Sequence, residues 1–162
     1  MRVVRISLVL IATGLWTAPS SAQIGAAPRC LHSSGESRIQ QQRREEAIDA
    51  ADMINRALMR MRRDTGYPTW EALAKSPWIA SLLAMSGPVG DLARKMQWGT
   101  DQPLPGWSLH YVAAQDAYAF SLTDMRDPCQ LTLATNNTGV VIEGRPADSR
   151  GQLRVVPLDS SH

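Results

Sequence analysis

Apolar positions in the first half of the chain recur at helical spacing. Five of them follow one another at intervals of three or four residues: Ile48, Ala51, Ile54, Leu58 and Met61. This period puts them on one stripe of an amphipathic helix, which we predict over residues 37–63. Ser33 followed by Glu36 has the form of a capping box just before the helix.

Glycine and proline divide the middle of the chain into short helical pieces. Gly66 and Pro68 end the long helix, because glycine suits a left-handed cap and proline cannot continue the helical hydrogen bonding. Gly87-Pro88 gives a second stop signal. We therefore predict short helices over residues 70–75, 78–85 and 91–97.

The hydrophobic period changes to two after Trp107, which indicates strands. We predict strands over residues 108–113, 117–122, 129–134, 140–143 and 152–158. Short connections, such as the turn at 136–139, favour antiparallel pairing. Helices that precede a sheet in this way predict an α+β domain. It has one long N-terminal amphipathic helix plus short helices, packed on a four- to five-stranded antiparallel sheet.

The chain opens with the pattern of a secretory signal peptide. Arg2 and Arg5 precede an apolar run over 6–16, and small residues at 19–22 predict cleavage after Ala22. The run is shorter than the roughly 20 residues that a membrane-spanning helix needs. We expect a periplasmic or secreted protein with no stable membrane span after cleavage; the alternative is an uncleaved anchor.

The predicted organisation is a signal peptide over 1–22, an irregular lead-in over 23–35, a single α+β domain over 36–158 and a tail over 159–162.

Charge argues against nucleic acid as a partner. The chain has 17 Lys+Arg against 15 Asp+Glu, and the predicted signal peptide contains two of the arginines and no acid. The mature chain is then formally neutral, without the basic excess that nucleic-acid binding favours. Arg56, Arg60 and Arg63 mark one helix face as a candidate partner-binding surface, and an ordinary solvated face is the alternative.

Cys30 and Cys129 are the only cysteines of the chain. Export would place them in an oxidising compartment, where disulfides persist, so we predict a Cys30–Cys129 bond. The alternative is a reactive thiol next to His32 or His110.

Two further groups of residues suggest binding or catalysis. The candidate aromatic surface consists of Trp70, Trp78, Trp98 and Trp107. Tryptophans of this kind either stack on a ligand such as a sugar or fill the core of a small domain. The candidate acid and base groups are His110, Asp124, Asp127 and Glu143, and the alternative for each is an ordinary solvated side chain.

The segment 47–77 resembles the middle region of type IV pilins and, more closely, of type II secretion pseudopilins. The motif runs from Leu58 to Thr69 and is followed by Glu71-Ala72-Leu73. In that family an amphipathic helix ends in such a segment and leads into an antiparallel sheet. The chain departs from the family because it lacks the long apolar N-terminal helix and its cleavage motif. The resemblance implies a pilin-like globular head that has lost filament assembly, such as an accessory or adaptor protein.

The sequence contains none of the spacings that mark common catalytic or metal sites. It has no glycine-rich phosphate loop, no His-Glu-x-x-His, no Gly-x-Ser-x-Gly and no cysteine-histidine spacing suited to zinc. We therefore expect no cofactor and no metal. The function hypothesis is an exported, non-catalytic protein-binding component of a cell-envelope, pilus or secretion assembly. The alternative is a small secreted hydrolase or carbohydrate-binding module that uses the tryptophan-rich middle.

Overall fold

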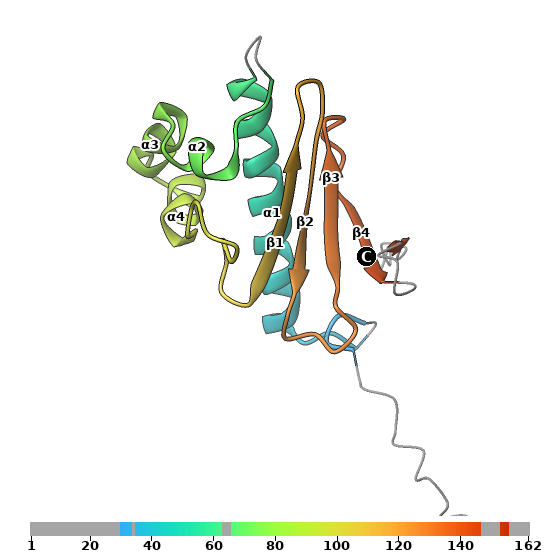
Figure 1. Cartoon of the computed structure of the whole chain (residues 1–162). Helices are drawn as coiled ribbons and strands as arrows, with labels where there is room; N and C mark the ends of the chain where they lie inside the picture. The colour runs from blue at the N-terminus through green and yellow to red at the C-terminus, as the bar shows by residue number, and fades with distance from the viewer. Residues whose placement is uncertain (1–29, 34, 63–65, 147–152, 156–162) are drawn as a thin grey trace, which may run out of the picture.

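The computed structural model describes residues 30–33, 35–62, 66–146 and 153–155. Within these residues the chain combines four helices with one antiparallel sheet, which confirms the predicted α+β class (Figure 1). The predicted signal peptide, the predicted tail and Arg63 lie outside the described residues.

The helix predicted over 37–63 is observed as α1, Arg38–Met61. Its capping box is Ser37 and Gln40, so the predicted pair of Ser33 and Glu36 is wrong. The Ser37 hydroxyl accepts from the Gln40 backbone N–H, and the Gln40 side chain accepts from the Ser37 N–H at 2.8 Å. This reciprocal arrangement satisfies two N–H groups that a helix start otherwise leaves unpaired, which is why α1 begins at Arg38.

The sheet is a five-stranded meander in the order β1-β2-β3-β4-β5, with every neighbouring pair antiparallel. Its strands are β1 (Trp107–Ala113), β2 (Tyr118–Asp124), β3 (Thr132–Asn136), β4 (Ile142–Pro146) and β5 (Leu153–Val155). β1 and β2 lie close to their predicted positions. β3 begins three residues later than predicted, because the preceding residues form a loop held by Asp127.

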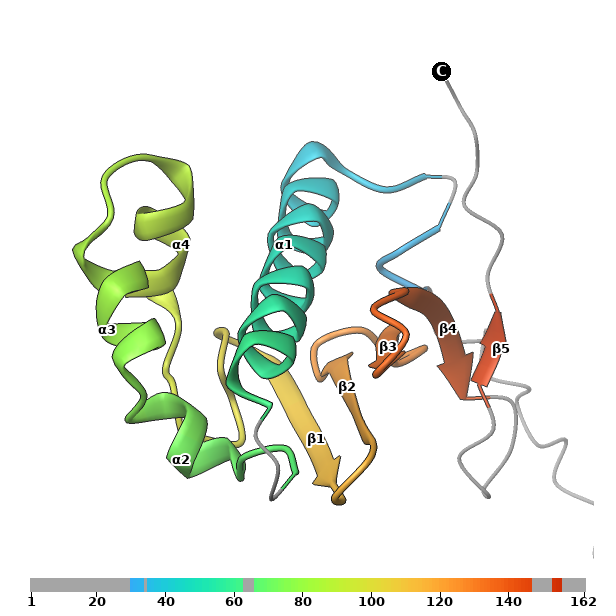
Figure 2. The same ribbon diagram turned by 90° about the horizontal axis from the view of Figure 1, so that it is seen from above.

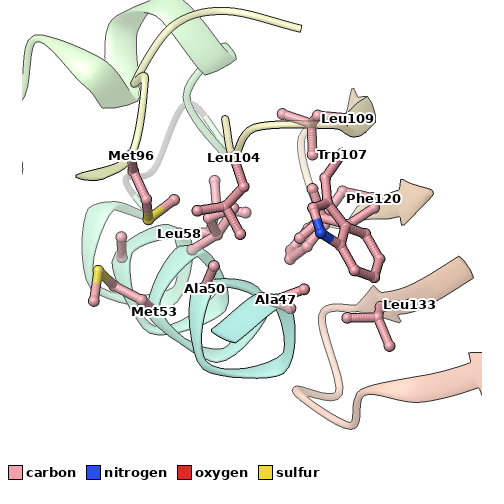
Figure 3. Packing of buried hydrophobic residues seen from close by; sticks show 14 of the residues in the cluster. Ala47, Ala50, Met53, Leu58, Met96, Leu104, Trp107, Leu109, Phe120 and Leu133 are labelled. Atoms are coloured by element: carbon pink, nitrogen blue, oxygen red, sulfur yellow. The ribbon is translucent and has the colours of Figure 1, made fainter. Parts of the chain in front are cut away.

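The core lies between α1 and one face of the sheet (Figures 1 and 2). Figure 3 shows Ala47, Ala50 and Leu58 of α1 on one side of this core, with side chains of the sheet opposite them. The sheet contributes Trp107, Leu109, Phe120 and Leu133. Alternation along β2 explains the arrangement, since every second side chain is buried toward α1 and those between are half-buried.

Three short helices lie beside α1, at its side away from β4 (Figure 2). They are α2 (Trp70–Ala74), α3 (Pro77–Ala84) and α4 (Pro88–Lys95). As predicted, α3 ends before Gly87-Pro88, and the same pair begins α4, which therefore starts three residues earlier than predicted. Gly87 has φ 83° and Pro88 takes the first helical position, where its missing N–H is not needed. A Cβ at Gly90 would lie 1.9 Å from the Met85 carbonyl oxygen, so α4 folds tightly back on the end of α3.

Two tyrosines on the sheet make the fold less stable at alkaline pH. Burial, reinforced by the neighbouring tyrosines, raises the pKa of both Tyr111 and Tyr118 from 10.0 to about 12. Their hydroxyls donate to the Pro68 carbonyl at 2.6 Å and to the Asn55 side chain, respectively.

We expect the free energy of unfolding to fall as the pH rises from 10.0 to about 12. In that window the folded chain keeps two phenol protons that the unfolded chain releases, so the contribution is complete below 10.0 and is lost above it. Denaturant unfolding across this range, together with the ultraviolet absorbance of tyrosinate, measures both effects. The variant Tyr111→Phe/Tyr118→Phe should lack this part of the pH dependence. Ionisation of both phenols near 10.0 in the folded protein would contradict the prediction.

Candidate functional site

The described residues form two regions with clustered charge. One is a buried set of ion pairs at the end of the sheet near the start of α1, called here the ionic cluster. Its members are His32, Glu36, Arg43, Arg44, Asp124 and Glu143. The other is an open groove between α1 and the pair α3 and α4. Of these two regions, the groove is the one that forms an open hollow.

Asp124, the last residue of β2, is the centre of the ionic cluster. Its side chain is fully buried, and its Oδ2 lies 2.9 Å from His32 Nε2. Its Oδ1 accepts from Arg43 Nη2 at 3.2 Å and from the Arg126 backbone N–H at 3.0 Å. Asp124 therefore joins the lead-in, α1 and the loop after β2 at one carboxylate.

The cluster continues from His32 toward β4. The second ring nitrogen of His32 contacts Glu36, whose other oxygen lies 3.3 Å from Arg44 Nη2. Arg44 Nη1 then donates to Glu143 Oε2 at 3.2 Å. The cluster thus brings three carboxylates against two guanidinium groups and one imidazole, so most of its charge is neutralised internally.

Asp127 fastens the neighbouring loop and the lead-in through backbone groups. It accepts from three N–H groups, those of Leu31, Cys129 and Leu131, at 2.9 to 3.1 Å. The Cys30–Cys129 disulfide closes the same junction, with the two Cα atoms 5.2 Å apart. The structure thus agrees with the predicted disulfide. Because Asp127 holds Cys129 and Leu131 in a loop, β3 begins only at Thr132.

Of the two alternatives for Asp124, Asp127 and Glu143, the solvated one is wrong, because all three side chains are buried. His110 does not join them, because it is exposed on β1. A general acid or base must reach the proton that it transfers. Asp124, Asp127 and Glu143 line neither the groove nor a second hollow beside β1, which is lined by Trp70, His110 and Tyr111. The ionic cluster and Asp127 are suited to holding the lead-in, α1, the loop after β2 and β4 together.

Sequence reasoning missed His32, Glu36, Arg43 and Arg44 as partners of these acids. One signal was present: the predicted Cys30–Cys129 bond places the residues after Cys30 next to those before Cys129. That proximity brings His32 to Asp124, which is 92 positions away in sequence.

The groove has a volume of about 670 Å³ and two unlike walls. The α1 wall carries mainly charged residues: Gln42, Glu45, Glu46, Asp49, Asp52, Met53, Arg56 and Arg60. The wall formed by α3, α4 and their connection is mainly apolar: Trp78, Leu82, Met85, Pro88, Val89, Asp91, Leu92 and Lys95. Exposed apolar side chains grouped in a groove mark an interaction surface or a ligand-binding site.

Two of the three arginines predicted as a partner-binding face line this groove, and the third, Arg63, lies outside the described residues. Arg56 Nη2 is 2.7 Å from Asp52 Oδ2, and the Arg60 guanidinium lies 4.3 Å from the Trp78 ring centroid. Across the groove, Lys95 Nζ is 2.9 Å from Glu46 Oε1. This hydrogen bond and the charge of Glu46 raise the pKa of Lys95 above its usual value.

The four tryptophans do not form one exposed aromatic surface. Trp70 and Trp107 are buried in the core, and Trp78 and Trp98 are half-buried against it. The Trp70 and Trp98 rings lie 5.6 Å apart, and their N–H groups donate to the Thr100 and Ala93 carbonyls. Trp70 and Trp107 therefore fill the core and are not free to stack on a sugar, whereas Trp78 lines the groove.

The described residues also contain no cluster of three or more acidic, histidine or cysteine side chains placed to hold a metal ion. Among the helices in the described ranges, none has the length and apolar character required to cross a bilayer. Comparison of the chain with protein-family models, with curated proteins and with solved structures finds no match.

Proposed function

We propose that the chain is a non-catalytic protein-binding domain of the cell envelope, with the groove between α1 and the pair α3 and α4 as its partner-binding site. The observation that carries this proposal is the groove itself. Met85 is 45% exposed and Val89 is 46% exposed beside the charged wall of α1. Exposed apolar side chains grouped in this way favour association with another protein.

The Cys30–Cys129 bond supports a location outside the cytoplasm, because structural disulfides persist in oxidising compartments. The signal-peptide pattern over 1–22 points to the same location. The pilin-like motif over 58–69 is the reason to propose a secretion or pilus assembly as the setting, with the chain as an accessory component.

The contacts of the acidic residues favour binding over hydrolysis. Asp124 and Glu143 are each paired with an arginine in the ionic cluster, and Asp127 is occupied by three backbone N–H groups. Trp70 and Trp107 pack inside the core. The hydrolase and carbohydrate-binding alternatives therefore gain no support from these five residues.

Site-specific photocrosslinking in intact cells of the native host tests the proposal. A photoreactive phenylalanine analogue is placed at Met85 or Val89 in the groove, and at Val112 on β1 as a control. Val112 is a matched control because it is 52% exposed, like the two groove positions. We expect protein adducts from the groove positions, and co-expression of an excess of the wild-type chain without the analogue should reduce them. Adducts at Val112 as abundant as those at Val89, or none at either groove position, would contradict the proposal.

A further inference from the structure

The charged residues on the α1 wall of the groove are ordered by sign. Glu45, Glu46, Asp49 and Asp52 come first, and Arg56 and Arg60 follow. Apart from Glu46, which directly follows Glu45, these residues are three or four positions apart, which puts them on one stripe of the helix. From Gln42 to Arg60 the stripe is roughly 27 Å long at 1.5 Å per residue. One half of this wall is acidic, and the other half is basic.

Several of these charges are already paired inside the protein. Asp52 pairs with Arg56, and Glu46 pairs with Lys95. Glu45 accepts from the amide group of Gln41, and Asp49 is exposed. Within the described part of the chain, neither Glu45 nor Asp49 has an ion-pair partner. The uncompensated charge of the wall is therefore negative at the end near Glu45 and Asp49 and positive at Arg60.

The walls of the groove also restrict the backbone of an occupant. The walls are helical apart from the connection between α3 and α4, and helices satisfy their own backbone hydrogen bonds except at their ends. The groove is lined by no strand edge among the described residues. An extended peptide would leave its N–H and C=O groups without protein partners there, whereas a helix satisfies its own.

We infer that the groove binds an amphipathic helix of a partner protein. The apolar stripe of that helix packs against the exposed Met85 and Val89. Its flank carries lysine or arginine opposite Glu45 and Asp49, and an acidic residue opposite Arg60. This inference rests on the proposed function, since it names the partner segment that the groove takes.

Synthetic peptides about 18 residues long, the length of the groove at 1.5 Å per residue, test the inference. All share one leucine stripe. The first peptide carries lysines on one half of its flank and glutamates on the other; the second carries glutamates on both halves. Fluorescence anisotropy of labelled peptide against the purified mature chain gives the affinity, and circular dichroism reports helix gained on binding. We expect the first peptide to bind as a helix and the second to bind more weakly.

Charge reversal then locates the site. The variant Glu45→Lys/Asp49→Lys should bind the first peptide about tenfold more weakly, because two exposed attractions become repulsions. It should bind the second peptide better than the wild type does. The control Glu71→Lys/Asp116→Lys makes the same charge change at exposed residues outside the groove and should leave both affinities unchanged.

Three results would overturn the inference: no binding of the first peptide to the wild type, binding without helix formation, or equal weakening by the groove and control variants. Photocrosslinking at Met85 and Val89 distinguishes failure of the helix inference from failure of the proposed binding function. Adducts there without peptide binding would refute the helix and leave the binding role standing, whereas loss of both results would refute both.

Discussion

Removal of the Cys30–Cys129 disulfide is expected to lower the free energy of unfolding by about 3–5 kcal/mol. The two cysteines are 99 positions apart, so the bond closes a very long loop and restricts the unfolded chain strongly. In the folded chain it also holds the lead-in where His32 reaches Asp124. Urea unfolding of the wild type and of Cys30→Ser/Cys129→Ser measures the loss.

A reducing agent provides the matched control for this prediction. Reduction should shift the unfolding midpoint of the wild type toward that of the double-serine variant, and it should leave the variant itself unchanged. A wild type that unfolds at the same urea concentration with and without reductant would show that the bond contributes no stability.

Replacement of Asp124 by asparagine is expected to cost about 3 kcal/mol or more, as the loss of one partner from a buried ion pair generally does. The asparagine side chain would have nearly the same shape as that of aspartate but no charge to compensate Arg43. Asp124 uses two oxygens to contact His32, Arg43 and the Arg126 N–H, whereas asparagine has only one acceptor oxygen for these three groups. Thermal or urea unfolding of Asp124→Asn gives the change.

Asp116→Asn is the control for that substitution. Its side chain is 88% exposed and lies 4.0 Å from Arg62, so its removal should change stability by less than about 1 kcal/mol. If Asp124→Asn and Asp116→Asn behave alike, the ionic cluster does not stabilise the fold.

Sequence patterns predicted the elements whose packing is regular. α1 was predictable because its apolar stripe repeats over many turns, and β2 because its buried and half-buried side chains alternate from end to end. The ends of elements were less predictable. The start of β3 depends on Asp127, whose backbone contacts include Leu31, 96 positions away.

The candidate site also has one part that the sequence predicted and other parts that it did not. Arg56 and Arg60 were predicted from their position on one helix face, and that face lines the groove. The apolar wall opposite was not predictable, because it depends on how α3 and α4 fold back at Gly87 and Gly90. The ionic cluster joins residues 81 to 99 positions apart, and no local pattern identifies such pairs.

The separation between Cys30 and Cys129 also sets an order of events during synthesis. At about 5–20 residues per second, residue 30 leaves the ribosome roughly 5 to 20 s before residue 129 does. Throughout that interval His32 has neither Asp124 nor its disulfide anchor available. The junction between lead-in and sheet therefore cannot close before β2 and the loop that follows it have been synthesised.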